Sequence, residues 1–337
     1  MSSSRIRRAT ALDEREFHAW LARFLRGPGR GLLPMGDDAA ALRVPPRRVA
    51  VLSTDALVEG THFLPDSPPA RIGAAAANVS LSDVAAKGAV PAALLLDLIV
   101  PPGTSRRWAQ EIVRGADRAG RLGGAPLVGG DTKPGATRAV VSTVLGWGRP
   151  GHLAPRRGAR PGDVLVTTGT VGRGGLAAHR LGRASPSPAR RRTALVELLA
   201  VRPRVREGIA LAPFAHAMLD TSDGLADASW ILAEASRVAV TVEENLLPWA
   251  AALRTTATTA RRRRALGFYG GDYELLAAVR PAALAQARAA VRRAGGRLTT
   301  IGRVDRGQGA RLEGTGRVVP MPAGGWRPFR KGSGRLP

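Results

Sequence analysis

The stretch from Ala70 to Val100 reads ARIGAAAANVSLSDVAAKGAVPAALLLDLIV and joins two different hydrophobic patterns. Its first part, residues 70–88, is rich in alanine, the strongest helix former, and ends at Gly88, a residue typical of helix ends. Its second part, residues 92–100, is a short and nearly continuous apolar run, which favours a buried strand. A helix that leads directly into a buried strand indicates an α/β protein.

The segments on either side of this stretch repeat the alternation. Before it, the spacing of apolar residues predicts a helix over 12–26 and a strand over 47–58. After it, we expect a helix over 104–122, a strand over 125–132 that runs into a glycine turn, and a strand over 138–148. The first half of the chain is therefore an alternating α/β segment.

A segment rich in Pro, Gly and Arg, residues 148–163, has no periodicity and predicts a boundary. Beyond it we expect a strand over 164–169, a glycine-rich turn over 170–175 leading into a helix, a strand ending within 217–224, a helix over 225–236, and strands over 238–243, 272–279 and 297–304. Because 337 residues exceed the usual size of one core, we predict two α/β domains with mixed sheets, 12–150 and 151–330, and a tail over 331–337.

Composition excludes several classes of protein. The chain has no cysteine, so it has no disulfide, thiolate metal site or thiol nucleophile. The apolar run over residues 89–102 contains Asp97 and is shorter than the ~18 residues of a membrane span. Residues 1–17 are partly basic but have no apolar segment, so we expect no secretory signal, no membrane partner and a cytoplasmic location.

The formal charge of +25 raises the alternative of a nucleic-acid-binding protein. The basic runs 190–192, 261–264 and 327–335 are scattered, however, and no recognition-helix pattern or zinc knuckle accompanies them. Only three of the 51 basic residues are lysines, namely Lys87, Lys133 and Lys331, which indicates a general compositional bias toward arginine. We therefore predict solvated surface arginines in loops and tails, and no dedicated nucleic-acid partner.

Acidic residues are scarce, and some of them stand among small residues in five segments, 35–44, 52–63, 78–89, 126–135 and 218–229. Asp55, Asp131 and Asp220 each follow a predicted strand among small residues. Carboxylates at the ends of strands line the crevice where α/β proteins bind ligands, and small neighbours leave room for the hydration of Mg²⁺. The pattern predicts a site for a metal ion and a polyphosphate.

Structural roles are the alternative for single residues of this set. Asp38 fits a turn residue and Asp223 a helix N-cap, whereas Asp83 gains little from its place inside an alanine-rich helix. No P-loop pattern occurs, and the five histidines, His18, His62, His152, His179 and His216, lack metal-ligand spacing. From the residues alone, we predict a magnesium-dependent α/β enzyme that acts on phosphates.

Six motifs occur in a specific order: GDDAA (36–40), STDALVEGTHF (53–63), NVSLSDVAAKGA (78–89), VGGDT (128–132), TSDGL (221–225) and GGDYELL (270–276). In order and spacing they resemble the thiamine-monophosphate kinase family of the aminoimidazole ribonucleotide synthetase-like superfamily. The resemblance extends from about residue 12 to GGWRPF (324–329). It implies ATP-dependent phosphorylation of thiamine monophosphate to the diphosphate, and a homodimer whose N-terminal domains form a β-barrel across the twofold axis.

The resemblance also implies roles for individual residues. The magnesium ligands would be Asp38, Ser53, Thr54, Asp55, Asp83, Asp131, Asp220 and Asp223, of which Asp38, Asp55, Asp83, Asp131 and Asp223 would be catalytic. The nucleotide contacts would be Gly130, Asp131, Ser222 and Arg156, with the adjacent Arg157 as the alternative. The substrate contacts would be His62 and Trp326, for which a surface histidine and a packed aromatic are the structural alternatives.

One motif departs from the family pattern. The family usually has Gly-Gly-Glu-Asp-Tyr-Glu-Leu, whereas GGDYELL lacks the glutamate that faces the substrate. We therefore expect this role to pass to Asp272 or to be absent. An aminoimidazole ribonucleotide synthetase-like enzyme with another phosphorylated substrate stays open as an alternative, while superfamily members that use a cysteine or selenocysteine are excluded.

Overall fold

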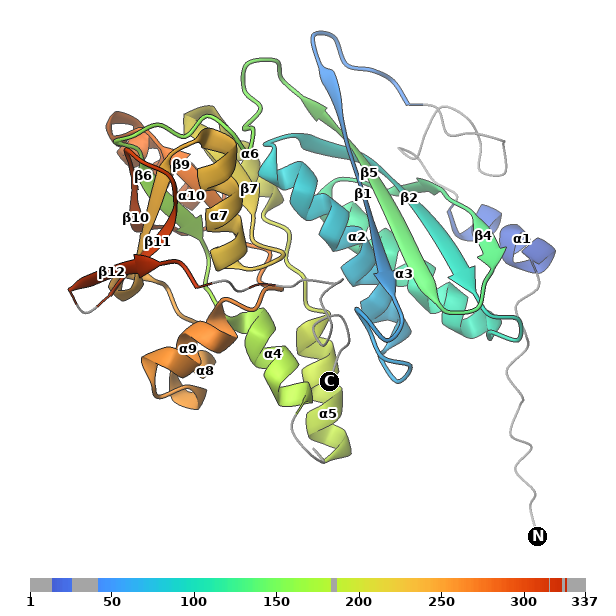
Figure 1. Ribbon diagram of the computed structural model, residues 1–337. Helices are drawn as coiled ribbons and strands as arrows, with labels where there is room; N and C mark the ends of the chain where they lie inside the picture. Colours follow the sequence, from blue (N-terminus) through green and yellow to red (C-terminus); the bar gives the residue numbers. More distant parts are fainter. Residues whose placement is uncertain (1–13, 26–41, 183–186, 315, 323–324, 326–337) are drawn as a thin grey trace.

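The structure is a computed structural model that describes residues 14–25, 42–182, 187–314, 316–322 and 325. Its helices and strands form two α/β units, each built on its own β-sheet (Figure 1). Within the described ranges, no strand of one sheet pairs with a strand of the other. The expected two-domain α/β fold with mixed sheets is therefore confirmed.

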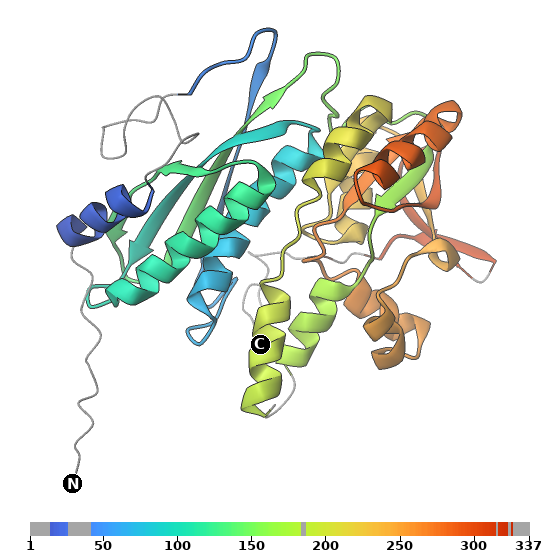
Figure 2. The ribbon, with the colours of Figure 1, turned by 180° about the vertical axis from the view of Figure 1, so that it is seen from behind.

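The first unit is a five-stranded sheet with its two long helices on one face. Its elements are α1 (Glu14–Phe24), β1 (Val49–Val58), α2 (Pro69–Ala86), β2 (Val90–Val100), α3 (Arg106–Gly123), β3 (Leu127–Gly129), β4 (Thr132–Pro134) and β5 (Ala139–Gly148). The strands lie in the order β1, β5, β2 and β3, and β4 also pairs with β2. Seen from behind in Figure 2, α2 and α3 lie in front of this sheet.

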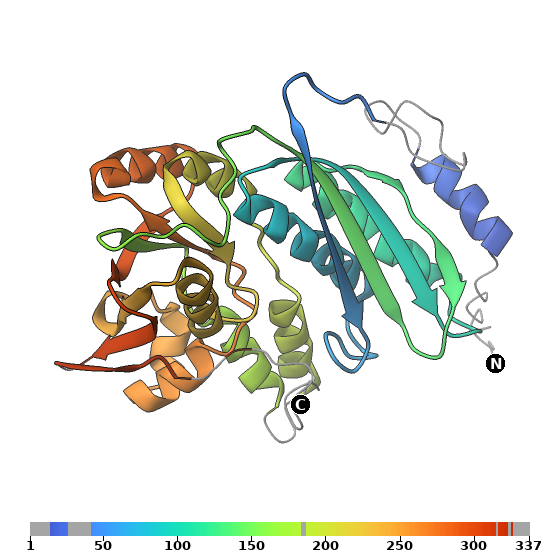
Figure 3. The same cartoon turned by 45° about the horizontal axis from the view of Figure 1, so that its top comes forward.

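The other face of this sheet has no helix over it (Figure 3). Cross-strand pairs such as Leu52 with Leu145 point to this face, because the neighbouring Ser53 contacts α2 on the opposite side. Leu52, Leu95 and Ile99 are 66%, 40% and 37% exposed there. In the described part of the single chain, the sheet is open and does not close into a barrel.

The second unit is a seven-stranded sheet in the order β12, β11, β8, β10, β6, β9 and β7. Its strands are β6 (Val164–Thr168), β7 (Ala215–Asp220), β8 (Ala239–Glu243), β9 (Leu275–Val279), β10 (Leu298–Asp305), β11 (Gly309–Gly314) and β12 (Arg317–Pro320). Its helices are α4 (Arg173–Leu181), α5 (Pro188–Leu198), α6 (Val205–Leu211), α7 (Leu225–Ser236), α8 (Ala251–Thr256), α9 (Ala260–Gly267) and α10 (Leu284–Arg293), with short 3₁₀ turns at Ala212–Phe214, Glu244–Leu246 and Pro281–Ala283. No helix of the described ranges has the length and hydropathy to span a bilayer.

Helices cover this second sheet on both faces, as strand β9 illustrates. Leu275, Ala277 and Val279 belong to the hydrophobic cluster formed with α10, whereas Leu276 and Ala278 belong to the cluster formed with α7. Since successive side chains of a strand point to opposite faces, a continuous apolar run is needed where both faces are buried. This explains why the sequence LLAAV shows no alternation.

Two predicted strands differ from those observed. The strand expected over 125–132 is divided into β3 and β4, and the strand expected over 272–279 begins only at Leu275. The division falls at Gly130, which has φ 153° and approaches β2 so closely that a Cβ would lie 1.8 Å from the carbonyl oxygen of Leu96. A Gly-Gly turn at Gly270 and Gly271, both with positive φ, precedes β9.

The placement predicted for two arginine runs in loops is wrong. Residues 190–192 lie in α5 and residues 261–264 in α9. Ser187 and Thr259 cap these helices, each accepting a hydrogen bond from a main-chain N–H of the first turn. Arg264 also forms an ion pair with the largely buried Glu244. Arginine is a good helix former, so a capping residue in front of an arginine run is a helix signal that the prediction overlooked.

Helix α2 also contacts the second unit, through α6. A Cβ on Gly208 of α6 would lie 2.1 Å from the carbonyl oxygen of Ala85, so the two helices approach at van der Waals distance. Lys87, which follows α2, donates hydrogen bonds to the carbonyl oxygens of Ala154 and Met218, at 3.1 and 2.9 Å. The first unit is therefore attached to the second along one helix.

We expect Gly208→Val to destabilise this junction, because the side chain collides with main-chain atoms that cannot rotate away. The loss should be on the order of 3 kcal/mol, measured by chemical denaturation. Ala210→Val on the same helix is the control, since Ala210 is only partly buried, and it should cost much less. Equal stability of the two variants would contradict the close packing of α2 and α6.

Candidate active site

Strand β1 directs its functional side chains toward α2. The Ser53 hydroxyl donates a hydrogen bond to Oδ2 of Asp83 on α2, at 2.5 Å. Asp55 is two residues farther along the strand and therefore points to the same face. The strand period thus places Ser53 and Asp55 beside Asp83.

The second unit brings a further carboxylate to Asp83. Strand β7 ends at Asp220, whose Oδ2 accepts a hydrogen bond from the Ser82 hydroxyl at 2.7 Å. Oδ1 of Asp220 accepts a hydrogen bond from the Ser222 hydroxyl at 3.1 Å. Because Ser82 and Asp83 are consecutive on α2, this contact joins acidic residues of both units.

Four carboxylates share one cavity of about 330 Å³ between the units, which we call the acid cavity; they are those of Asp55, Asp83, Asp220 and Asp223. Arg156, Ser222 and His62 also line it. A second cavity of about 660 Å³ lies beside it, lined by Ser53, Asp83, Lys87, Arg156 and Arg157 among others. Arg156 lines both cavities, so a polyphosphate held there would lie between cations and carboxylates.

The carboxylates of the acid cavity shift one another's protonation. Burial, followed by the charges of Asp83, Asp220 and Asp223, raises the pKa of Asp55 to about 6, although this side chain still reaches solvent. Burial and then Asp83 raise the pKa of Asp220 to about 6 against the hydroxyl hydrogen bonds that lower it. The pKa of Asp223 is raised by burial, Asp227 and Asp83. The cavity therefore concentrates negative charge that a cation would relieve.

The donor set fits Mg²⁺ held jointly by the protein and phosphates. All its donors are carboxylate or hydroxyl oxygens, the ligands that this ion prefers. Within the described ranges, no three acidic or histidine side chains are close enough to enclose one ion by themselves. Mg²⁺ usually takes one or two carboxylates and completes its shell with water and substrate phosphates, so an open arrangement of this kind suits it.

His62 lines the acid cavity in its neutral form. Burial lowers its pKa, and its Nδ1 accepts a hydrogen bond from the main-chain N–H of Val58 at 3.1 Å. An accepting Nδ1 places the proton of the neutral imidazole on Nε2. Ser222 also lines the acid cavity. The N-cap residue of α7 is Gly224, so Asp223 is not the side-chain cap of that helix.

Three expected ligands do not join the acid cavity. The Thr54 hydroxyl points to the open face of the sheet, where it accepts a hydrogen bond from Thr143. Asp131, which is half exposed, forms an ion pair with Lys133 at 3.0 Å, and its main-chain N–H donates to Asp97. Asp131 and the adjacent Gly130 lie beyond β2, three strand spacings from Asp55 or roughly 14 Å.

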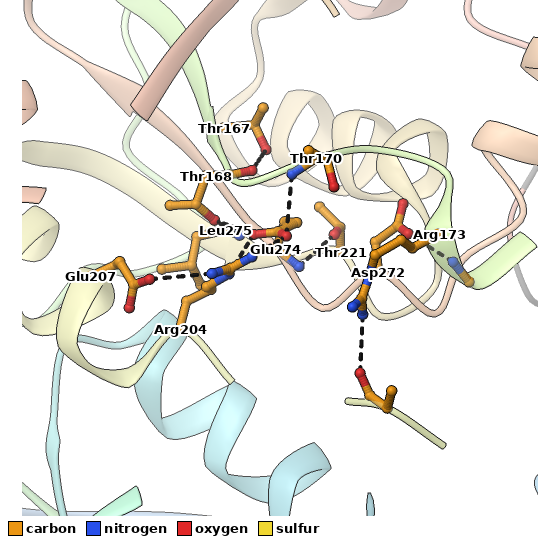
Figure 4. A network of polar contacts seen from close by, with 12 residues as sticks. Thr167, Thr168, Thr170, Arg173, Arg204, Glu207, Thr221, Asp272, Glu274 and Leu275 are labelled. Carbon is orange, nitrogen blue, oxygen red and sulfur yellow. Dashed lines mark hydrogen bonds and ion pairs between the residues drawn. The ribbon is translucent and has the colours of Figure 1, made fainter. Parts of the chain in front are cut away.

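Asp272 is also turned away from the cavity. Its buried carboxylate accepts hydrogen bonds from the main-chain N–H groups of Gly172 and Gly174, at 2.6 and 2.9 Å. Figure 4 shows Asp272 beside Arg173, next to the network in which Glu274 accepts hydrogen bonds from Arg204. Its carboxylate holds a glycine-rich turn and does not line the acid cavity, so this placement does not favour the expectation that Asp272 replaces the missing glutamate.

Asp38 and Trp326 lie outside the described residues, so their roles stay predictions. Sequence reasoning did not single out Lys87 or Tyr273, although both line the cavities. Each belongs to a rare residue type in this chain, with three lysines and two tyrosines among 337 residues. The rarity of lysine and tyrosine in a chain with a strong bias toward arginine was the signal that could have identified these two residues.

Comparison with protein families identifies the class of protein. The model of the AIR synthase related protein, N-terminal domain, matches residues 36–148, and that of its C-terminal domain matches residues 160–314. The chain therefore belongs to the AIR synthase related family.

Similar proteins within this family are named thiamine-monophosphate kinase. The thiamine-monophosphate kinase of Synechococcus elongatus is 37% identical over 272 residues, which are 75% of this chain and 82% of that protein. The crystal structure of thiamine-monophosphate kinase from Stenotrophomonas maltophilia has a TM-score of 0.78 at 31% identity, covering 91% of this chain and 99% of that one. AaThiL complexed with AMPPCP and TMP has a TM-score of 0.72 at 25% identity, covering 94% and 99%. The resemblance carried by the six motifs is confirmed.

We expect Asp220→Asn to stabilise the metal-free protein at pH 7.5. The folded-state pKa of Asp220 is raised to about 6 from 3.8, so the folded state binds more protons between these values and loses stability as the pH rises. The gain in melting temperature should be full above pH 6 and vanish below about pH 4.

Asp163→Asn is the matched control for this substitution. Asp163 is equally buried, but its carboxylate contacts His216 and the main-chain N–H of Arg160. Its replacement should lower the melting temperature at pH 7.5. A loss of stability in Asp220→Asn at that pH would contradict the repulsion inferred for the acid cavity.

Proposed function

We propose that the chain catalyses ATP-dependent phosphorylation of thiamine monophosphate to thiamine diphosphate. The observation that carries this proposal is the acid cavity, which both units build together and which Arg156 also lines. Support comes from relatives named thiamine-monophosphate kinase and from the related AaThiL complex with AMPPCP and TMP. An aminoimidazole ribonucleotide synthetase-like activity has no comparable support among these relatives.

The proposed reaction is a direct in-line transfer. A phosphate oxygen of thiamine monophosphate forms a bond to the γ-phosphorus of ATP while the bond from that phosphorus to the ADP oxygen breaks. Both reactants are anions, so the protein must bring them together and neutralise their charge. Mg²⁺ ions, which Asp55, Asp83, Asp220 and Asp223 would hold, would supply most of this neutralisation when bound. The guanidinium of Arg156, which lines both cavities, would orient the polyphosphate.

We assign metal binding to the residues that the cavity brings together, namely Asp55, Asp83, Asp220 and Asp223, with Ser53 and Ser82 orienting Asp83 and Asp220. Asp38 stays a proposed ligand. Asp131 is proposed as a ligand on the open face, apart from this cluster. Arg156 is preferred over Arg157 as the nucleotide contact because it lines both cavities. His62 and Trp326 are proposed at the thiamine end.

We also propose that the open sheet of the first unit pairs with that of a second chain, so that the two sheets form a barrel. Exposed Leu52, Leu95 and Ile99 form an apolar face, and such a face is costly in water. Pairing across a twofold axis would bury it and leave fewer free edges. We propose domains at 12–150 and 151–330, because residues 149–163 between β5 and β6 contain no helix or strand.

The test of the proposed function is an assay of ADP formation with and without thiamine monophosphate, together with incubation of the protein with labelled ATP alone. We expect ADP only when thiamine monophosphate is present, and no labelled protein, because the transfer is direct. Label retained on the protein would contradict the in-line mechanism, and ADP formation independent of thiamine monophosphate would contradict the substrate.

Asp83→Asn should lower kcat/KM by orders of magnitude, since Asp83 lines both cavities and accepts the hydrogen bond of the Ser53 hydroxyl. Excess Mg²⁺ should restore little of the activity, and EDTA should abolish activity in the wild type. The circular dichroism spectrum should not change. Near wild-type activity in this variant would refute the metal assignment.

For the pairing of two chains, light scattering should report about twice the chain mass of 35.3 kDa. Leu52→Asp should shift the protein toward monomers, because it places a charge on the apolar face. Arg303→Gln is the control, since Arg303 belongs to a surface ion-pair group on the second unit. A monomeric wild-type protein at micromolar concentration would exclude the proposed barrel.

A further inference from the structure

Tyr273 has a backbone conformation that tyrosine rarely adopts. Its φ is 55°, in the left-handed region, and only two other non-glycine residues of the described chain share this feature, Arg47 and Arg237. Arg237 ends helix α7, where a left-handed residue is common, whereas Tyr273 lies at the acid cavity. A conformation of this kind persists only where the surroundings impose it, and such residues concentrate at functional sites.

The two neighbours of Tyr273 impose this conformation. Asp272 is held by the main-chain N–H groups of Gly172 and Gly174. Glu274 is held by the guanidinium of Arg204, at 2.5 and 2.6 Å, and by the Thr168 hydroxyl at 2.8 Å. Figure 4 shows both acidic side chains within this network. Because both buried neighbours are fixed, the backbone of Tyr273 has no freedom to relax.

The side chain of Tyr273 crosses from the second unit to the first. Its ring packs against the hydrophobic cluster of the first unit, which includes α2 and β1. Its phenol belongs to the wall of the acid cavity. In the described part of the chain, its hydroxyl makes no hydrogen bond, and it is not among the polar atoms sealed from solvent. The hydroxyl therefore opens into the cavity.

The hydroxyl of Tyr273 is protonated at neutral pH, as that of an ordinary tyrosine is. Burial raises the pKa of Tyr273, and the charges of Asp220, Asp55, Asp223 and Asp83 raise it further. A protonated phenol is a hydrogen-bond donor that faces four carboxylates. The hydroxyls of Ser82 and Ser222 already donate to Asp220, and that of Ser53 donates to Asp83. A phosphate bound in the cavity would offer further acceptor oxygens to the hydroxyl of Tyr273, which makes no hydrogen bond within the described part of the chain.

A purely structural role accounts for the ring but not for the hydroxyl. Phenylalanine would fill the same apolar space, and the hydroxyl of Tyr273 makes no hydrogen bond within the described part of the chain. We propose that Tyr273 is a phosphate-positioning residue, whose hydroxyl donates a hydrogen bond to an oxygen of the phosphoryl groups bound in the acid cavity. This inference rests on the proposed function, because it requires phosphates at the four carboxylates.

The test is Tyr273→Phe, which keeps the ring, the packing and the backbone. A hydrogen bond to a charged group that aligns the reacting phosphates should lower kcat by roughly 10- to 100-fold when it is removed. KM for ATP and the calorimetric affinity for AMPPCP with Mg²⁺ should change by less than about threefold, because the metal ions carry most of ground-state binding. The melting temperature should stay the same or rise.

Tyr269→Phe is the matched comparison, since Tyr269 is the only other tyrosine and lines the same cavity. Tyr273 packs against the hydrophobic cluster of the first unit and Tyr269 does not belong to that cluster, so the two rings have different surroundings within the described chain. The kcat of Tyr269→Phe should stay at least about tenfold above that of Tyr273→Phe, because this phenol is not aligned with the reacting phosphates.

Two results would overturn the inference while the proposed function stands. One is a kcat of Tyr273→Phe within about threefold of the wild type; the other is a fall in kcat that accompanies a clear fall in melting temperature. Failure of the proposed function is recognised separately, because the wild-type protein would then form no thiamine diphosphate. That outcome would overturn the role of Tyr273 as well.

Discussion

Packing of helix α2 on both sides is the constraint on which the rest of the structure depends. Twelve of its eighteen residues are buried, and the alanines and glycine among them let α3 on one side and α6 on the other approach closely. Its polar residues are paired within this packing, as Ser80 with the carbonyl oxygen of Ser142 and Ser82 with Asp220. A helix exposed on one side could not carry Asp83 to a junction between two units, and the four carboxylates would not meet.

The acid cavity opposes the folding that creates it. Desolvation and mutual repulsion raise the pKa of Asp55 and Asp220 to about 6, so each carboxylate is less stable when charged in the folded protein than in the unfolded chain at neutral pH. The hydroxyls of Ser82 and Ser222 offset part of this cost at Asp220. Cations that bind the folded state remove more of it, so ion binding and folding stability are coupled. The repulsion that destabilises the folded protein in the absence of bound cations also increases the affinity of the acid cavity for metal-bound phosphates.

Local patterns predicted most elements, whereas positions set by distant contacts escaped prediction. Alanine content and Gly88 located α2, and a continuous apolar run located β2, because both signals lie within the segment itself. Strand alternation also separates Ser53 from Thr54, a distinction that the sequence contained but the predicted ligand set did not use. The separation of Asp131 from Asp55 depends on the strand order β1, β5, β2 and β3, which no local pattern specifies.

The departure in GGDYELL follows the same physical logic. Asp272 accepts hydrogen bonds from main-chain N–H groups about one hundred residues earlier in the chain, and a Cβ on Gly174 would lie 2.2 Å from the carbonyl oxygen of Gly270. The two glycine-rich segments therefore fit against each other with the Asp272 carboxylate as the link. Withdrawing this carboxylate to bind a substrate would leave two buried N–H groups unpaired, at a cost of about 1–3 kcal/mol each. The hydrogen bonds of Asp272 therefore favour a role in holding this turn over substitution for the missing glutamate.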